Sequence, residues 1–204
     1  LVTGSIGEPS NLIPLLATDS ASHEIAGYIY NGLVKYDKDL TIVGDLAESW
    51  DISRDNLTIT FHLKKGVTWQ DGKPFTADDV LSTYKIIVDP KTPTAYASDF
   101  QAVREAKVLD DHTFRVTYKT AFAPGLISWG LGILPRHLVE GKEITSSPLI
   151  RKPVGTGPYV FKEWIPGERV TVEANKTYFE GQPYLSRRVT RIIPDTATMF
   201  LELK

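Results

Sequence analysis

Hydrophobic and polar residues alternate strictly at 57–63, where the sequence reads Leu-Thr-Ile-Thr-Phe-His-Leu. Such alternation is typical of a β-strand with one face against a core and the other face in water. Turn-forming residues at 53–56 and 70–73 bound this strand on both sides. Related patterns predict further strands at 1–6, in hairpins at 107–118 and 159–174, and within 187–195.

Other segments have the three-to-four-residue hydrophobic spacing of an amphipathic helix. Ile25, Ile29 and Leu33 follow Asp19 and Ser20, either of which can serve as the N-cap residue. We therefore expect a helix that begins near residue 20 and ends close to residue 33, with the glycine at 32 near its end.

A second helix is expected to begin after Thr76. Thr76 and Asp79 have the spacing of a capping box, in which the Thr76 hydroxyl accepts from the Asp79 N–H, and Asp89-Pro90 stops the pattern. A short helix is expected at 135–141, and the start of another at 196–204. Because strands and helices interleave, the sequence indicates an α/β fold.

Two closely spaced glycines occur in 153–164, which reads Pro-Val-Gly-Thr-Gly-Pro-Tyr-Val-Phe-Lys-Glu-Trp. A phosphate-binding loop presents N–H groups at the start of a helix, but here Pro158 has no N–H and a strand follows. Gly155 and Gly157 are therefore not expected to bind phosphate. We expect a tight turn, with unusual backbone angles, that directs the chain into the sheet.

Composition and charge exclude several classes of partner. The chain has 204 residues and is 42% hydrophobic, enough to bury one core or two small ones. Lys and Arg number 23 against 25 Asp and Glu, and neither sign clusters, so no nucleic-acid-binding face is expected. No apolar run has the length of a transmembrane helix. The first residue is Leu1 and not methionine, so we expect that an upstream segment was removed.

Residues that could carry catalysis or bind a metal do not form a recognisable motif. The four histidines are far apart and show no zinc-ligand spacing, and there is no cysteine. The Gly-x-Ser-x-Gly motif of an activated serine is absent from the sequence. The paired carboxylates Asp78-Asp79 and Asp110-Asp111 are explained by a helix start and by a turn. We therefore expect neither an enzyme nor a cofactor.

An ordered set of segments is more specific than any of these single features. The segments are Asp45–Ser53, Leu57–Val80, Ile133–Gly141, Pro153–Trp164 and Arg187–Asp195. Together they resemble the extracytoplasmic solute-binding proteins of peptide and nickel ABC transporters, a family that includes the oligopeptide- and dipeptide-binding proteins. The resemblance runs from about residue 8 to the last residue, and 61–80 and 155–164 are its most specific parts.

The resemblance implies a two-lobed periplasmic-binding-protein fold of which this chain is lobe one. It also implies the α+β type, with a mixed sheet built from the two ends of the chain. Residues 1–36 and 152–204 are expected to form the main part of the lobe, with 37–151 as an inserted, smaller, strand-rich subdomain. The second lobe is expected to be absent from this chain.

The family resemblance also implies a function and its partners. The expected ligand is an oligopeptide or a similar small solute, held between the lobes and delivered to the permease of an ABC importer. The protein is expected to be a periplasmic or membrane-anchored extracellular monomer. The ligand-binding residues are expected in the stretches 18–22 and 94–100 and beside a pair of glycines near 130: Ser20, Ala21, Ser22, Tyr96, Ser98, Phe100 and Trp129.

Two other functions remain open from the sequence. One is a binding protein that presents its ligand to a receptor and not to a permease. The other is a hydrolase that uses paired carboxylates.

Overall fold

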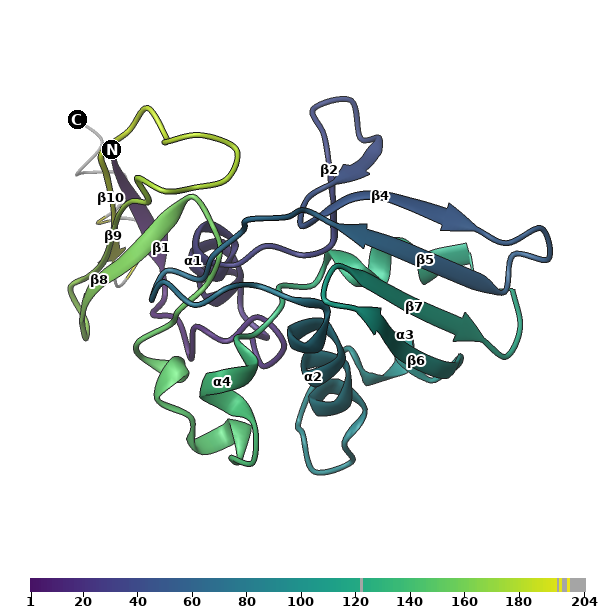
Figure 1. The fold of residues 1–204 in the computed structure, drawn as a ribbon. Coiled ribbons are helices and arrows are strands. Elements are labelled where there is room, and N and C mark those ends of the chain that lie inside the picture. The colour runs from purple at the N-terminus through teal and green to yellow at the C-terminus, as the bar shows by residue number, and fades with distance from the viewer. Residues whose placement is uncertain (122, 194, 196–197, 199–204) are drawn as a thin grey trace.

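The computed structural model describes residues 1–121, 123–193, 195 and 198. Within these residues the strands form two four-stranded sheets and one two-stranded sheet. Figure 1 shows one four-stranded sheet at the left, the other at the right, and helices between and beneath them. None of the described helices is both long and apolar enough to cross a membrane.

The first sheet joins the two ends of the chain. Its strands are β1 (Val2–Ile6), β10 (Arg187–Ile193), β9 (Arg169–Ala174) and β8 (Tyr159–Ile165), in that order. β1 runs parallel to β10, with Val2 opposite Val189, and the remaining neighbours are antiparallel. This confirms the predicted hairpin at 159–174 and the mixed sheet.

The second sheet comes from the middle of the chain. Its order is β4 (Ala47–Ile52), β5 (Thr58–Leu63), β7 (Thr113–Tyr118) and β6 (Val103–Asp110), all antiparallel. Ile59, Phe61 and Leu63 of β5 are buried and the residues between them are partly exposed. The strand predicted at 57–63 is therefore confirmed with the expected face inward.

A short hairpin, β2 (Val34–Tyr36) and β3 (Ile42–Gly44), projects from the body of the molecule (Figure 1). It straddles the subdomain boundary expected between 36 and 37. The division of the lobe into 1–36 with 152–204 and an inserted 37–151 stays a prediction.

Helix α1 begins where its capping residue predicted, but the end expected close to residue 33 is wrong. α1 (Ser20–Ile29) begins after Asp19, whose carboxylate accepts from the Ser22 N–H. It ends four residues before Leu33, because Tyr30 is already extended. Helix α1 packs on β8.

Helix α2 (Ala77–Val88) begins after Thr76 with the expected capping box and packs on β6 and β7. The Thr76 N–H donates to Asp79 Oδ2 at 2.9 Å. The remaining helices are short: α3 (Ala97–Phe100), α4 (Arg136–Val139) and the 3₁₀ turns Ala123–Gly125, Ile127–Gly130, Ile144–Ser146 and Pro148–Ile150. The helix expected at 196–204 lies outside the described residues.

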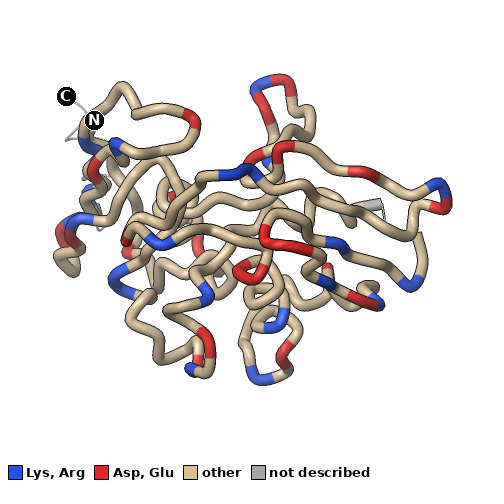
Figure 2. Tube along the Cα trace, viewed as in Figure 1, with Lys and Arg blue, Asp and Glu red and all other residues tan. Residues whose placement is uncertain are grey.

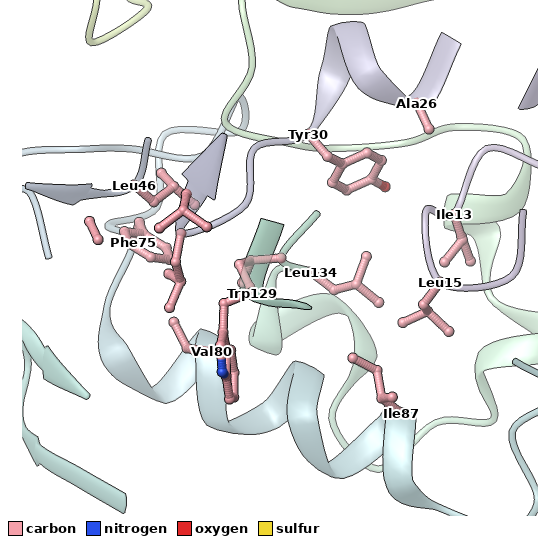
Figure 3. Close-up of a cluster of buried hydrophobic side chains, with 14 of the residues drawn as sticks. Ile13, Leu15, Ala26, Tyr30, Leu46, Phe75, Val80, Ile87, Trp129 and Leu134 are labelled. Atoms are coloured by element: carbon pink, nitrogen blue, oxygen red, sulfur yellow. The ribbon is translucent and has the colours of Figure 1, made fainter. Parts of the chain in front are cut away.

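The buried side chains form a core that includes residues from both halves of the fold. Figure 3 shows part of this core, with Tyr30 after α1 and with Val80 and Ile87 on α2. Trp129 and Leu134 come from the segment between β7 and α4. Trp129 is 2% exposed and its ring centroid lies 4.9 Å from that of Phe114.

Gly155 and Gly157 have a different role from the one predicted. Neither has a φ in the left-handed region, so the expected unusual backbone angles are wrong. Both pack directly against the last turn of α1: a Cβ on Gly155 would lie 1.8 Å from the Ile29 carbonyl oxygen. The Gly157 N–H donates to the same oxygen at 2.8 Å. The glycines are therefore required for close approach of two backbones.

Candidate functional site

The loop before α1 is built around the Asp19 carboxylate. Oδ1 accepts from the Ser22 N–H at 2.7 Å, and Oδ2 accepts from the hydroxyls of Ser22 and Ser10, each at 2.7 Å. Partial burial acts to raise the pKa of Asp19, but these hydrogen bonds outweigh it and lower the pKa. A negative charge is thereby fixed at the N-terminus of α1, where the helix dipole favours it.

This arrangement divides the residues predicted at 18–22 into two groups. Ser22 is fully buried, and its hydroxyl also accepts from the Ser10 N–H at 3.0 Å. Ala21 is 5% exposed. Ser20, at the start of α1, is exposed. Of these three predicted residues, only Ser20 presents its side chain to solvent.

The second predicted stretch meets the first at one point. The Tyr96 hydroxyl lies 3.4 Å from His23 Nε2, and the two rings are perpendicular with centroids 6.4 Å apart. Tyr96 is half-buried, and burial, with the charge of Asp99, raises the pKa of its hydroxyl. Segments 73 residues apart in the sequence are thus brought together, as the resemblance to the solute-binding family requires if both contact one ligand.

The remaining predicted residues also include both exposed and buried side chains. Ser98 is exposed, and its hydroxyl lies 3.4 Å from Asp99 Oδ1. Phe100 is 3% exposed, and its ring packs perpendicular to that of Trp129 at 5.2 Å. The Trp129 indole N–H donates to the Tyr118 hydroxyl at 3.0 Å. Since Phe100 and Trp129 form part of the aromatic core, we do not carry them into the proposed ligand-binding surface.

A polar network that the sequence did not indicate lies near the C-terminal end of α1. Asp45 is 4% exposed, and its carboxylate accepts from Asn31 Nδ2 at 3.0 Å through both oxygens. Lys35 Nζ lies 3.4 Å from Asp45 and 2.6 Å from Glu180. The Tyr178 hydroxyl donates to Glu180 at 3.1 Å and accepts from Asn31 at 3.3 Å. The network therefore holds the hairpin β2–β3 against the loop that follows β9.

The charges in this network stabilise one another. Burial acts to raise the pKa of Glu180, but the contacts with Lys35 lower it. Burial likewise acts to lower the pKa of Lys35, and its contacts with Glu180 and Asp45 raise it. Burial raises the pKa of Asp45, because the Lys35 ammonium and the Asn31 amide compensate only part of the lost hydration. These are the properties of a structural ion-pair network that fixes one loop to another.

Three cavities in the described structure lie away from Ser20, Tyr96 and Ser98. One, of about 570 Å³, lies beside the polar network and is lined by residues that include Tyr36, Asp45, Pro158 and Tyr178. Two others, of about 400 and 490 Å³, lie along α2 and the 136–145 segment. None of these three has Ser20, Tyr96 or Ser98 in its lining. Ser20 is exposed and Tyr96 is half-buried, and neither lines one of these three cavities.

Charge on the molecule is interspersed. Figure 2 shows basic and acidic residues alternating along the loops and strand ends, without a face of one sign. An electrostatic site for a polyanion is therefore not supported by the described residues.

Comparisons with known proteins identify the family of this chain. Residues 41–204 match the family described as bacterial extracellular solute-binding proteins, family 5 Middle. The oligopeptide-binding protein AppA of Bacillus subtilis is 34% identical over 210 residues, which cover 100% of this chain and 39% of AppA. The heme-binding protein A of Haemophilus influenzae is 33% identical over 223 residues, covering 96% of this chain and 40% of that protein.

Solved structures extend the likeness to three dimensions. AppA in complex with a nonapeptide matches with a TM-score of 0.93 at 33% identity, over 100% of this chain and 42% of AppA. NikZ from Campylobacter jejuni, in complex with Ni(L-His), matches with a TM-score of 0.93 at 28% identity, over 100% of this chain and 41% of NikZ. The chain thus spans about two fifths of the length of these relatives. It belongs to the family 5 bacterial extracellular solute-binding proteins.

Proposed function

We propose that this chain is the first lobe of the substrate-binding component of an ABC importer. In this proposal the protein captures an oligopeptide or a similar small solute between two lobes and delivers it to a membrane permease, outside the cytoplasm and without a catalytic step. The observation that carries the proposal is the match over the whole chain to AppA, whose structure holds a nonapeptide.

The ligand-contacting surface of the proposed lobe is the exposed side of the His23–Tyr96 contact. Ser20 and Tyr96 supply a hydroxyl each and Tyr96 an aromatic wall, with Ser98 on the adjoining helix α3. An aromatic ring beside a few polar groups is typical of small-solute sites. A peptide that is bound through its main chain requires few specific side-chain contacts from this surface. Such binding is compatible with loose selectivity for the peptide's side chains.

A second lobe would close the site. Closure excludes water and strengthens the hydrogen bonds made to the trapped ligand. Because one lobe supplies only one wall of the proposed cleft, we expect the 204 residues alone to bind oligopeptides far more weakly than the whole protein. Calorimetry of both against one peptide pool measures the difference. Equal affinities would contradict the two-lobe cleft.

A pair of tyrosine variants tests the location of the site in the whole protein. Tyr96→Ala should weaken peptide binding by about tenfold, since loss of a buried aromatic contact costs more than about 1 kcal/mol. Tyr184→Ala is the matched control, because Tyr184 is fully exposed on the loop before β10. Unchanged affinity in Tyr96→Ala, or an equal loss in both variants, would show that Tyr96 does not contact the ligand.

A further inference from the structure

Two dipeptides in this chain have the sequence in which a peptide backbone rearranges most readily. They are Asn31-Gly32 and Asp71-Gly72. Glycine has no side chain to hinder its own nitrogen, so that nitrogen can attack the side-chain carbonyl carbon of the preceding residue. Whether the reaction proceeds in a folded protein depends on how firmly that side chain and that nitrogen are held.

Asn31 is firmly held. The residue is 7% exposed, its side-chain amide nitrogen donates to Asp45, and its amide oxygen accepts from the Thr156 hydroxyl at 3.0 Å. A Cβ on Gly32 would lie 2.4 Å from the Gly130 carbonyl oxygen, so the backbone there is closely packed. We expect no reaction at this dipeptide in the folded protein.

Asp71 lies in an accessible turn and is held chiefly by one side chain. Its side chain is 32% exposed, and Oδ2 lies 2.6 Å from His137 Nε2. Because a carboxylate can only accept, the imidazole donates. Oδ1 accepts from the Lys73 N–H at the longer distance of 3.3 Å. The Gly72 nitrogen, in a left-handed turn with φ +85°, donates to the Trp69 carbonyl at 2.8 Å.

We propose that Asp71-Gly72 is the isoaspartate-forming site of this protein and that His137 restrains it. In the reaction the Gly72 nitrogen forms a bond to Asp71 Cγ. The carboxylate takes up a proton from water. The N–H proton and one carboxyl oxygen, with that added proton, then leave as water, and a five-membered succinimide results. Water then adds to either ring carbonyl. Addition at Cγ restores aspartate, and addition at the main-chain carbonyl gives isoaspartate with no change in mass.

His137 opposes the first step by geometry. While Oδ2 is bound to the imidazole on α4, Cγ cannot turn toward the Gly72 nitrogen without breaking that bond. The turn also holds the Gly72 N–H toward Trp69, away from the carboxyl group. Release of His137 removes the shorter of the two hydrogen bonds that hold the carboxylate.

Isoaspartate at this position would loosen an important junction. The neighbouring Gln70 donates its N–H to the Gly155 carbonyl at 2.9 Å, and its side chain donates to the Tyr159 carbonyl at 2.8 Å. Its side-chain oxygen accepts from the Gly155 N–H at 3.1 Å. An extra backbone carbon at residue 71 shifts Gln70 relative to the first sheet, so these bonds cannot all persist.

Ageing of the purified chain at neutral pH and 37 °C tests the proposal. Isoaspartate is measured by enzymatic methylation and located by peptide mapping, in the parent and in His137→Ala. His62→Ala is the matched control, because His62 Nε2 lies 2.8 Å from Asp51 Oδ2 in a similar exposed pair, but Ile52 and not glycine follows. A synthetic peptide of residues 67–75 gives the unrestrained rate.

We expect a clear order in the rates of isoaspartate formation at Asp71. The parent and His62→Ala should be slowest, His137→Ala severalfold faster, and the peptide fastest; His137→Gln, which keeps a donor, should lie between parent and His137→Ala. Circular dichroism before ageing confirms that each variant is folded. Equal rates in the parent and His137→Ala, or a parent as fast as the peptide, would overturn the restraint, and isoaspartate mapped only elsewhere would overturn the site.

Discussion

Gly155→Ala should destabilise this chain severely, and the reason is a single contact. The new Cβ would lie 1.8 Å from the Ile29 carbonyl oxygen and 2.6 Å from its carbon. Both belong to backbone, so no side-chain rotation relieves the clash, and α1 must separate from the segment that leads into β8. Overpacking of this kind costs about 1–3 kcal/mol.

The separation also breaks a hydrogen bond. The Gly157 N–H donates to the Ile29 carbonyl at 2.8 Å, and Ile29 is fully buried. An unsatisfied buried group costs about 1–3 kcal/mol, so the total loss is about 2–6 kcal/mol. In a chain of this size that corresponds to a fall in melting temperature on the order of 10 °C.

Gly27→Ala is the matched control. Gly27 lies within α1, and a Cβ there meets nothing within 4 Å. Alanine should therefore stabilise the helix by about 0.5–1 kcal/mol. Thermal and urea unfolding, followed by circular dichroism, measure both variants. A Gly155→Ala chain with the stability of its parent would refute the close-approach explanation.

Other variants test the capping residues. Asp79→Ala should lower the free energy of unfolding by about 3 kcal/mol. The buried carboxylate accepts from the backbone N–H groups of Thr76 and Arg136 and from the Trp69 indole N–H, and all three bonds would be lost. An unchanged midpoint of urea unfolding would contradict this. Thr76→Ala should cost about 1 kcal/mol, measured in the same way. The pKa of Asp19 is lowered on folding, so its contribution to stability is complete above its ordinary pKa of 3.8 and is lost as pH falls through the folded value. The difference in free energy of unfolding between the parent and Asp19→Asn should therefore become smaller below that pH. A difference that stays constant in urea titrations at acid pH would refute the stabilising role of the Asp19 carboxylate.

Contiguous patterns in the sequence predicted the local elements well. The alternation at 57–63 placed Phe61 in the core, and the spacing of Thr76 and Asp79 marked the start of α2. Each of these signals is confined to a few consecutive residues, so periodicity and capping rules apply directly. The family resemblance added the mixed sheet formed by the two ends of the chain.

Contacts between distant segments could not be predicted in this way. Asn31 and Tyr178 are 147 residues apart, and nothing local shows that their side chains meet. Ser22 carries a hydroxyl of the kind that often binds ligands, yet it is buried and holds a loop through Asp19. Phe100 carries an aromatic ring of the kind that often lines a cleft, yet it lies in the core. In each case the residue type is compatible with either role, and only burial distinguishes them.

The proposed binding surface depends on how rigidly the two sheets are joined. Gln70, beside the second sheet, is hydrogen-bonded to Gly155 and Tyr159 at the entry to the first. Asn31 and Asp45 form a second junction in the buried network. A binding site made from separate segments gains affinity when those segments are held in place before the ligand arrives, because less entropy is lost on binding.

We expect these two junctions to hold the segment that carries Ser20 and His23 in place relative to the one that carries Tyr96. Glycine at 155 is part of the same arrangement, since it lets α1 lie directly against the chain that Gln70 holds. A variant that loosens this packing without touching the proposed surface should therefore weaken ligand binding in the whole protein as well as stability. Gln70→Ala is such a variant, and peptide affinity measured well below its melting temperature separates the two effects. Unchanged affinity in a measurably destabilised Gln70→Ala protein would show that the surface does not depend on these junctions.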